Sequence, residues 1–229
     1  WGINTYETRG VIPVILDKAE KYGLTVTIYY EENPASSPEA RVEQGFKDLK
    51  FIYQKYAEHP AYLKLKGEPV LFVYGRAMNQ VAWEEWAAII NKFEKETNNS
   101  FAIIADNQSD IAAAMFEGIH TYNITSLLKD KSLNEISEKV KNKYKSIKNT
   151  AVKNDSISVL TVIPGFDGRK VGSDLHIPRR EGELYQTLWE EALKVKPDWI
   201  VITSWNEWHE GTEIEPSSEH GDKYLKITR

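Results

Sequence analysis

The chain has 229 residues, enough for one sizeable domain with its own hydrophobic core. Its formal net charge is −5, and acidic and basic residues are mixed along the chain, which leaves no basic face for a nucleic acid. The sequence contains no cysteine, so disulfide bonds and thiol catalysis are excluded, and it has no apolar run of the ~18 residues that a membrane-spanning helix needs.

Six segments have the composition of buried β-strands. They are rich in β-branched and aromatic residues, and most are continuous apolar runs, which is typical of parallel strands covered on both faces. In chain order they are residues 24–30, 70–74, 101–105, 118–122, 158–163 and 199–203.

Segments with helical periodicity lie between these strands. Their apolar stripes occupy residues 11–22, 42–56, 83–93, 136–144 and 184–192. Ser37 is placed to cap the second helix with Pro38 at its first position, and Ser132 with Glu135 has the spacing of a capping box. The chain therefore alternates strands with helices.

This alternation predicts a parallel α/β fold, either an open doubly wound sheet or a (β/α)8 barrel. No glycine-rich phosphate loop follows any strand, which argues against a nucleotide-binding open sheet. Barrel enzymes carry their active sites at the C-terminal ends of the strands. Polar and aromatic residues recur at those ends here: Glu31 and Glu32, Tyr74 and Arg76, Asp106 and Asn107, Tyr122 and Asn123, Asp167 and Arg169, and Glu207 and Glu210. These strand ends favour the barrel.

A closed barrel needs eight strands and typically about 250 residues, whereas only six strands are evident. The chain opens with Trp1-Gly2 followed by a helix, as if it began just after a strand. We therefore expect residues 1–229 to form a single barrel domain with about six of the eight strand–helix units, the first two being absent from this sequence.

The most informative segment is the octapeptide WNEWHEGT at residues 205–212, directly after the last predicted strand. It places two carboxylates and an imidazole between two indoles, an environment that shifts pKa values and suits sugar chemistry. If the backbone turns helically, Glu207 and Glu210 share a face with Cβ atoms ~5–6 Å apart. Their mutual repulsion would raise the pKa of one of them, but the spacing does not say which.

Residues 205–216 closely resemble the signature of the family 99 glycoside hydrolases, the endo-α-mannosidases and their bacterial WbsX-like relatives. The PGFD tetrapeptide at 164–167 with Arg169 is similar to the motif of that family's seventh strand, and Tyr30-Glu31 is similar to another strand end. Trp1-Gly2 resembles the end of the family's second strand, which agrees with the six-strand count. The resemblance extends over the whole chain.

The resemblance implies a retaining, endo-acting α-mannosidase that needs no cofactor and acts on an oligosaccharide or polysaccharide. It implies that Glu210 is the general acid and later the general base. It implies that Glu207 takes the proton of the sugar 2-hydroxyl, so that the 2-oxygen attacks the anomeric carbon and a 1,2-anhydro sugar forms. In the usual retaining scheme the second carboxylate is itself the nucleophile.

Several further residues are candidates for binding the sugar. They are Trp1, Glu31, Tyr74, Tyr122, Asn206, Trp208 and His209. His209 either orients a carboxylate or is a wall residue that points away, and Trp205 and Trp208 either stack on sugars or pack in the core. Glu31 either binds a hydroxyl or forms a salt bridge. We expect Asp167 and Arg169 to be a structural pair and Asn206 to tie down the turn through its amide.

Two other functions remain open. One is a barrel glycosidase with its carboxylates on separate strands, for example Asp167 with Glu207, and the other is a non-catalytic protein of carbohydrate binding or polysaccharide assembly. A metal site would have to use acidic and histidine residues of the C-terminal region, namely His209, Glu210, Glu215, His220 and Asp222. Their spacing matches no HExxH-type pattern, so we expect no metal.

Overall fold

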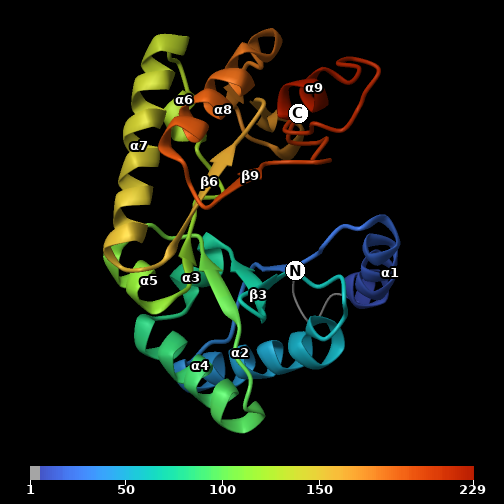
Figure 1. Ribbon diagram of the computed structural model, residues 1–229, viewed down its shortest axis with the longest axis vertical. Coiled ribbons are helices and arrows are strands. Elements are labelled where there is room, and N and C mark those ends of the chain that lie inside the picture. Colours follow the sequence, from blue (N-terminus) through green and yellow to red (C-terminus); the bar gives the residue numbers. More distant parts are fainter. Residues whose placement is uncertain (1–5) are drawn as a thin grey trace. The chain divides into compact units, whose positions relative to one another are not determined.

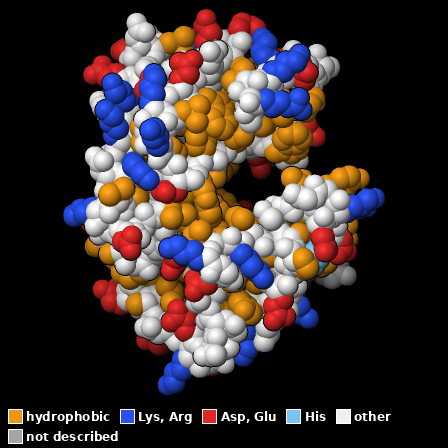
Figure 2. All heavy atoms as spheres, in the orientation of Figure 1, with side chains coloured by type: hydrophobic (Ala, Val, Ile, Leu, Met, Phe, Trp, Pro, Cys, Tyr) orange, Lys and Arg blue, Asp and Glu red, His pale blue; other side chains and the backbone are white. Residues whose placement is uncertain are grey.

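The computed structural model describes the backbone of residues 6–229 and the side chains from residue 10 onward, so the prediction for Trp1 lies outside the described residues. The chain divides into two compact units. The N-terminal unit extends to residue 107 and includes 114–118, and the C-terminal unit comprises 108–113 and 119–229. On the face shown in Figure 2, lysine and arginine side chains are interspersed with acidic ones, as the mixed sequence predicts.

The N-terminal unit is a parallel sheet with helices packed against it. Its elements are α1 (Tyr6–Tyr22), β1 (Ile28–Tyr30), α2 (Pro38–Ile52), a π-helical turn (Tyr53–Ala57), β2 (Lys64–Leu65), β3 (Glu68–Val73), α3 (Gly75–Gln80), α4 (Trp83–Thr97) and β4 (Ala102–Ala105). Strand β3 pairs in parallel with β1 on one side and β4 on the other, and α2 packs on α4. Helix α5 (Asp110–Met115) and strand β5 (Gly118–Ile119) follow along the chain.

The C-terminal unit contains the second parallel pair. Its elements are α6 (Thr125–Leu128), α7 (Leu133–Lys153), β6 (Ile157–Val162), β7 (Phe166–Asp167), a 3-10 turn (Gly168–Val171), β8 (His176–Ile177), a second 3-10 turn (Arg180–Gly182), α8 (Glu183–Val195), β9 (Trp199–Ile202) and α9 (Lys223–Thr228). Helices α7 and α8 pack on each other and on β6 (Figure 1).

Buried apolar side chains hold β6 in place. Val159, Leu160 and Val162 are 0% exposed, and Val140 and Tyr144 of α7 are equally buried. Full burial of such a side chain stabilises the folded state by about 1.5–3 kcal/mol, so these contacts hold β6 firmly against α7. Because β6 and β9 pair in parallel with Val162 opposite Ile202, the connections that follow them leave from the same edge.

The predicted helix starts are confirmed. The Ser37 hydroxyl accepts from the backbone N–H of Ala40 at 3.2 Å, with Pro38 at the first helical position. Ser132 and Glu135 form the reciprocal capping box of α7, in which the Glu135 carboxylate accepts from the Ser132 N–H at 2.8 Å.

All six predicted strands are present, though two are shorter than predicted, and several short elements were missed. Residues 24–30 contribute only Ile28–Tyr30 and an isolated bridge at Val26, and residues 118–122 contribute only Gly118–Ile119. The missed elements include the β2–β3 hairpin, the β7–β8 hairpin and the short helices α3, α6 and α9. Lys66 and Gly67 both have positive φ, 53° and 93°, which is the backbone of a two-residue hairpin turn, so the Lys-Gly pair was the signal.

Candidate active site

The segment after β9 is a loop closed at its base by backbone hydrogen bonds. The N–H of Ser204 donates to the carbonyl of Thr212 at 2.9 Å, and the carbonyl of Ser204 accepts from the N–H of Ile214 at 3.1 Å. One residue further on, the Trp205 carbonyl accepts from the N–H of Glu215 at 3.0 Å. These bonds fix where the loop leaves the strand and where it returns.

A tight turn lies inside this loop. The Ser204 hydroxyl accepts from the N–H of Glu207 at 2.9 Å and is 2.7 Å from the Thr212 hydroxyl. The N–H of Glu210 donates to the carbonyl of Glu207 at 3.1 Å, a helix-like turn of the kind that the spacing required. The turn is thus held by hydroxyls and backbone, where the sequence suggested the Asn206 amide. The backbone carbonyl of Asn206 accepts from the N–H of Trp208 at 2.9 Å.

The two glutamates have different electrostatic surroundings. Partial burial raises the pKa of Glu210 above its usual value, the neighbouring negative charge of Glu207 raises this pKa further, and His209 opposes the shift. The Nε2 atom of His209 is 3.3 Å from a carboxylate oxygen of Glu207. His209 therefore contacts a carboxylate, as in the first of its two candidate roles.

Both indoles of the motif face solvent. Trp205 is 50% exposed and Trp208 is 42% exposed, which excludes core packing for either. The indole N–H of Trp208 donates to the Glu215 carboxylate at 3.0 Å, which fixes the ring edge. Exposed aromatic faces of this kind are available to stack on a ligand.

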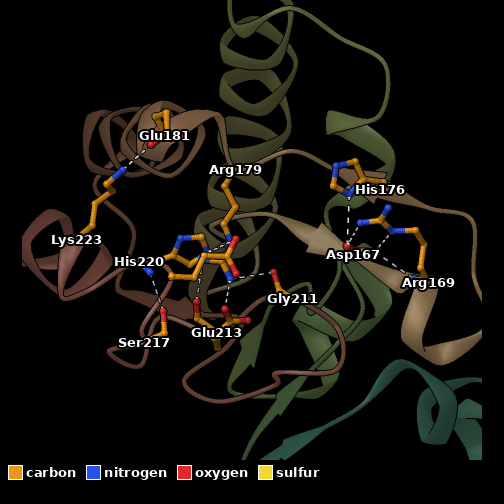
Figure 3. A network of polar contacts seen from close by, with 11 residues as sticks. Asp167, Arg169, His176, Arg179, Glu181, Gly211, Glu213, Ser217, His220 and Lys223 are labelled. Carbon is orange, nitrogen blue, oxygen red and sulfur yellow. Dashed lines mark hydrogen bonds and ion pairs between the residues drawn. The ribbon is translucent and has the colours of Figure 1, made fainter.

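The connection between β6 and α8 contacts the motif at residues 205–212. The N–H of Asp167 donates to the carbonyl of Glu210 at 2.7 Å. The guanidinium of Arg169 donates to both carboxylate oxygens of Asp167, and this pairing holds the pKa of Asp167 well below its usual range (Figure 3). Asp167 and Arg169 thus form the expected structural pair.

Arg179 contacts the stretch of chain that follows Glu210. Its guanidinium donates to the carbonyls of Gly211 at 3.0 Å and Glu213 at 2.9 Å, and it lies 2.8 Å from the Glu213 carboxylate (Figure 3). It also lies over the ring of Tyr224, 4.6 Å from the centroid. Sequence reasoning missed Arg179, because its partners in the loop lie 32 and 34 residues away along the chain.

A cavity of about 470 Å³ opens beside these residues. Trp208 and Tyr224 contribute aromatic surface to its lining, while Arg179 and Glu213 contribute charge.

The remaining candidates lie at other strand ends. Tyr122 belongs to the C-terminal unit, and its carbonyl accepts from the hydroxyl of Thr203, directly after β9, at 3.3 Å. In the N-terminal unit Glu31 is exposed just after β1, and Tyr74 is half-buried just after β3, with its N–H donating to the Tyr30 carbonyl at 2.9 Å. Glu31 and Tyr74 therefore end adjacent strands of that unit.

Within residues 10–229, whose side chains the structure describes, no group of three or more acidic or histidine side chains has the geometry of a metal site. The residues weighed for one have other partners. Glu215 accepts from Trp208, Asp222 pairs with Lys226 at 2.8 Å, and the His220 ring packs on Tyr224. No helix of the described chain is both long and apolar enough to cross a membrane.

A carboxyl group of raised pKa, a second carboxylate in the same turn and exposed indoles, all at the end of a parallel strand, form a candidate site with the kinds of groups that glycosidases use. Residues 1–226 match the family model described as glycosyl hydrolase family 99, and the chain belongs to this family. The resemblance deduced from the motif is thereby confirmed.

Curated relatives agree with this assignment. The chain is 29% identical over 230 residues to the glycoprotein endo-alpha-1,2-mannosidases of Mus musculus and Rattus norvegicus, covering 93% of this chain and 47% of each relative. It is 27% identical over 222 residues to a glycoprotein endo-alpha-1,2-mannosidase-like protein of Homo sapiens, covering 90% of this chain and 46% of that protein. The chain thus spans about half the length of these relatives.

A solved structure confirms the fold class. The GH99 endo-alpha-mannosidase of Bacteroides thetaiotaomicron matches with a TM-score of 0.77 at 24% identity, covering 100% of this chain and 70% of that one. The same enzyme in complex with bis-tris-propane gives a TM-score of 0.78 at 23% identity, covering 100% of this chain and 75% of that one. The chain has the α/β barrel type of fold that its strand–helix alternation predicts.

Proposed function

We propose that this chain carries the catalytic pair of a retaining, endo-acting α-mannosidase that cleaves α-mannosidic linkages in mannan or N-glycan-like oligosaccharides. The observation that carries the proposal is the unequal pair in one turn, with Glu210 shifted toward its protonated form beside Glu207. Two glutamates with different environments can take different roles. The names of the curated relatives support the substrate class.

The reaction has two steps. In the first, the protonated Glu210 donates its proton to the glycosidic oxygen, and Glu207 takes the proton of the 2-hydroxyl. The 2-oxygen attacks the anomeric carbon as the bond to the leaving sugar breaks, which gives a 1,2-anhydro sugar. In the second step the Glu210 carboxylate takes a proton from water, the water oxygen attacks the anomeric carbon, and Glu207 returns its proton to the 2-oxygen. Two inversions at the same carbon retain the α-configuration.

The environment of each group suits its step. The acid must hold a proton near neutral pH, and burial together with the charge of Glu207 favours protonated Glu210. His209 contacts Glu207 at 3.3 Å and would orient its carboxylate toward the 2-hydroxyl. Sugar binding is assigned to strand-end and turn residues, namely Trp1, Glu31, Tyr74, Tyr122, Asn206, Trp208 and His209, with Trp208 as the stacking surface.

The rival pairing of Asp167 with Glu207 fits less well. Arg169 occupies both carboxylate oxygens of Asp167 and lowers its pKa, so Asp167 is a poor general acid, and as a nucleophile it would first have to give up this pairing. A non-catalytic carbohydrate-binding role would account for the exposed indoles. It would not require a carboxyl group of raised pKa such as that of Glu210.

Three variants test the assignment on α-mannan oligosaccharides, with products followed by NMR. Glu207→Gln and Glu210→Gln should each lower kcat by about 10²–10⁴-fold, the usual contribution of acid–base catalysis. Asp167→Asn should keep turnover within about tenfold of the parent, since Asp167 acts on the site only through its backbone. Full turnover in either glutamate variant, inversion in the first-formed product or no cleavage by the parent would contradict the proposal.

The unequal roles can be separated with an activated substrate. A mannosyl substrate with a good leaving group needs no proton donor for the first step, so it should restore the first step in Glu210→Gln. It should not help Glu207→Gln, because the 2-hydroxyl must still lose its proton. Equal rescue of both variants would reverse or abolish the assigned roles.

A further inference from the structure

Arg179 holds the backbone immediately after Glu210 at two points. Its two terminal guanidinium nitrogens donate separately, one to the carbonyl of Glu213 at 2.9 Å and the other to the carbonyl of Gly211 at 3.0 Å. The second nitrogen also lies 2.8 Å from the Glu213 carboxylate. A guanidinium presents its donors in one rigid plane, so this three-way contact fixes orientation as well as distance.

The contact is largely removed from solvent. The side chains of Arg179 and Glu213 are 14% and 8% exposed, and the ring of Tyr224 covers one face of the guanidinium. One Glu213 carboxylate oxygen pairs with Arg179, while the other is buried with no hydrogen-bond partner among the described residues. Glu213 is therefore committed to a single cation, and its charge balances the buried arginine.

A second segment of the same connection holds the other side of Glu210. The Asp167 N–H donates to the carbonyl of Glu210 at 2.7 Å, and Gly211 follows with φ of +60°. A Cβ atom on Gly211 would lie 3.0 Å from the Cβ of Asp167, so the glycine permits the close approach. The backbone from Glu210 to Glu213 is thus tied to the β6–α8 connection at three carbonyls. Figure 3 shows the two of these contacts that Arg179 makes, with Gly211 and Glu213.

We propose that Arg179, with Glu213 as its counter-ion, is a positioning residue that sets the place of the Glu210 carboxyl relative to Glu207. The inference rests on the proposed function for the identity of the reacting groups. Arg179 itself holds carbonyls of the loop that carries Glu210. Its effect reaches the chemistry because a misplacement of about 1 Å in a catalytic group can cost about 100-fold in rate.

The test compares Arg179→Gln and Arg179→Lys with Lys223→Gln. Lys223 pairs with the exposed Glu181 at 2.7 Å in the same unit, so its loss removes a neighbouring cation without touching the motif loop. Arg179→Gln should lower kcat by about 100-fold and change KM by less than about threefold. Arg179→Lys should recover part of kcat, since an ammonium keeps the charge but lacks the planar fork. Lys223→Gln should stay within about twofold of the parent in both constants.

Amide hydrogen exchange provides a readout that needs no turnover. Peptides covering residues 204–215 should exchange at least about tenfold faster in Arg179→Gln, whereas peptides of α7 should be unchanged. If Arg179→Gln fails to fold, Arg179→Lys and Glu213→Gln carry the same test, both with smaller losses in the same direction. Unchanged kcat in a folded Arg179→Gln variant, or unchanged exchange at 204–215, would overturn the inference.

The two failures can be told apart. If Glu210→Gln keeps full turnover, the proposed function is wrong, yet the exchange rates still report whether Arg179 holds the loop. If both glutamate variants are inactive while Arg179→Gln is fully active, the proposed function stands and the positioning role falls.

Discussion

The connections that follow β6 and β9 leave adjacent strands at the same edge, yet the pKa values of their carboxyl groups are shifted in opposite directions. After β6, Asp167 is neutralised by Arg169 and its pKa is lowered. After β9, partial burial and then the neighbouring charge of Glu207 raise the pKa of Glu210. A paired carboxylate supports a loop, whereas a carboxylate kept from a strong cation can still move a proton. The connection after β6 therefore supports the loop after β9, to which it is hydrogen-bonded.

The contact between these connections is most easily broken at Gly211. Gly211→Ala would force a side chain into a left-handed backbone with Asp167 at 3.0 Å, so Asp167 and the turn must separate. We expect a loss of about 1–3 kcal/mol in the free energy of unfolding and a drop in kcat of about 100-fold. Chemical denaturation and steady-state kinetics measure the two effects. Gly172→Ala is the matched control, because Gly172 also has positive φ but nothing lies within 4 Å of its added Cβ. Equal losses of kcat in both variants would show that the close contact between Gly211 and Asp167 has no special role.

The Glu210→Gln variant tests whether the pKa of Glu210 is raised in the folded protein. Because the pKa of Glu210 is raised in the folded protein, its contribution to stability is present below the unfolded-state pKa of about 4.3 and is lost as pH rises through the folded-state pKa. A glutamine cannot ionise, so the variant should melt at a higher temperature than the parent at pH 8, and the gain should vanish at pH 4. Calorimetry from pH 4 to pH 8 measures the melting temperature of both proteins. Glu219→Gln is the control, because the Glu219 side chain is exposed. A lower Tm at pH 8 would contradict the direction of the shift.

The smallest effect is expected at the start of α7, which lies outside both connections in the sequence. Ser132→Ala removes the capping box and should cost about 1 kcal/mol in the free energy of unfolding. Because α7 supports β6 through buried apolar contacts, kcat should remain within about twofold of the parent. A large kinetic loss would show that the site depends on the helix start as well as on the loops.

Local sequence signals accounted for much of the fold. The apolar runs located all six strands, and Ser37 and Ser132 marked helix starts that the structure confirms. The β2–β3 hairpin was missed because its strand β2 has only two residues and no periodicity of its own. The Lys66-Gly67 turn was its one local mark.

The sequence singled out the residues of the candidate site but did not give their electrostatics. The spacing of Glu207 and Glu210 indicated a pair, but which carboxyl has the raised pKa depends on burial, which in turn depends on how the loop packs. Arg179 was out of reach for a different reason. Its partners lie 32 and 34 residues away along the chain, and no local pattern links them.

The hydroxyl pair at the base of the motif loop has a consequence for ionic strength. Ser204 and Thr212 close the turn with neutral groups, and the bonds around them are backbone bonds. Mobile ions screen exposed charges over about 10 Å at 0.1 M salt and have little effect on neutral hydrogen bonds. The exposed pair of Asp167 and Arg169 weakens as salt is added, while the turn that carries both glutamates keeps its shape. The backbone of this turn is thus expected to respond less to ionic strength than the exposed charge contacts of its side chains.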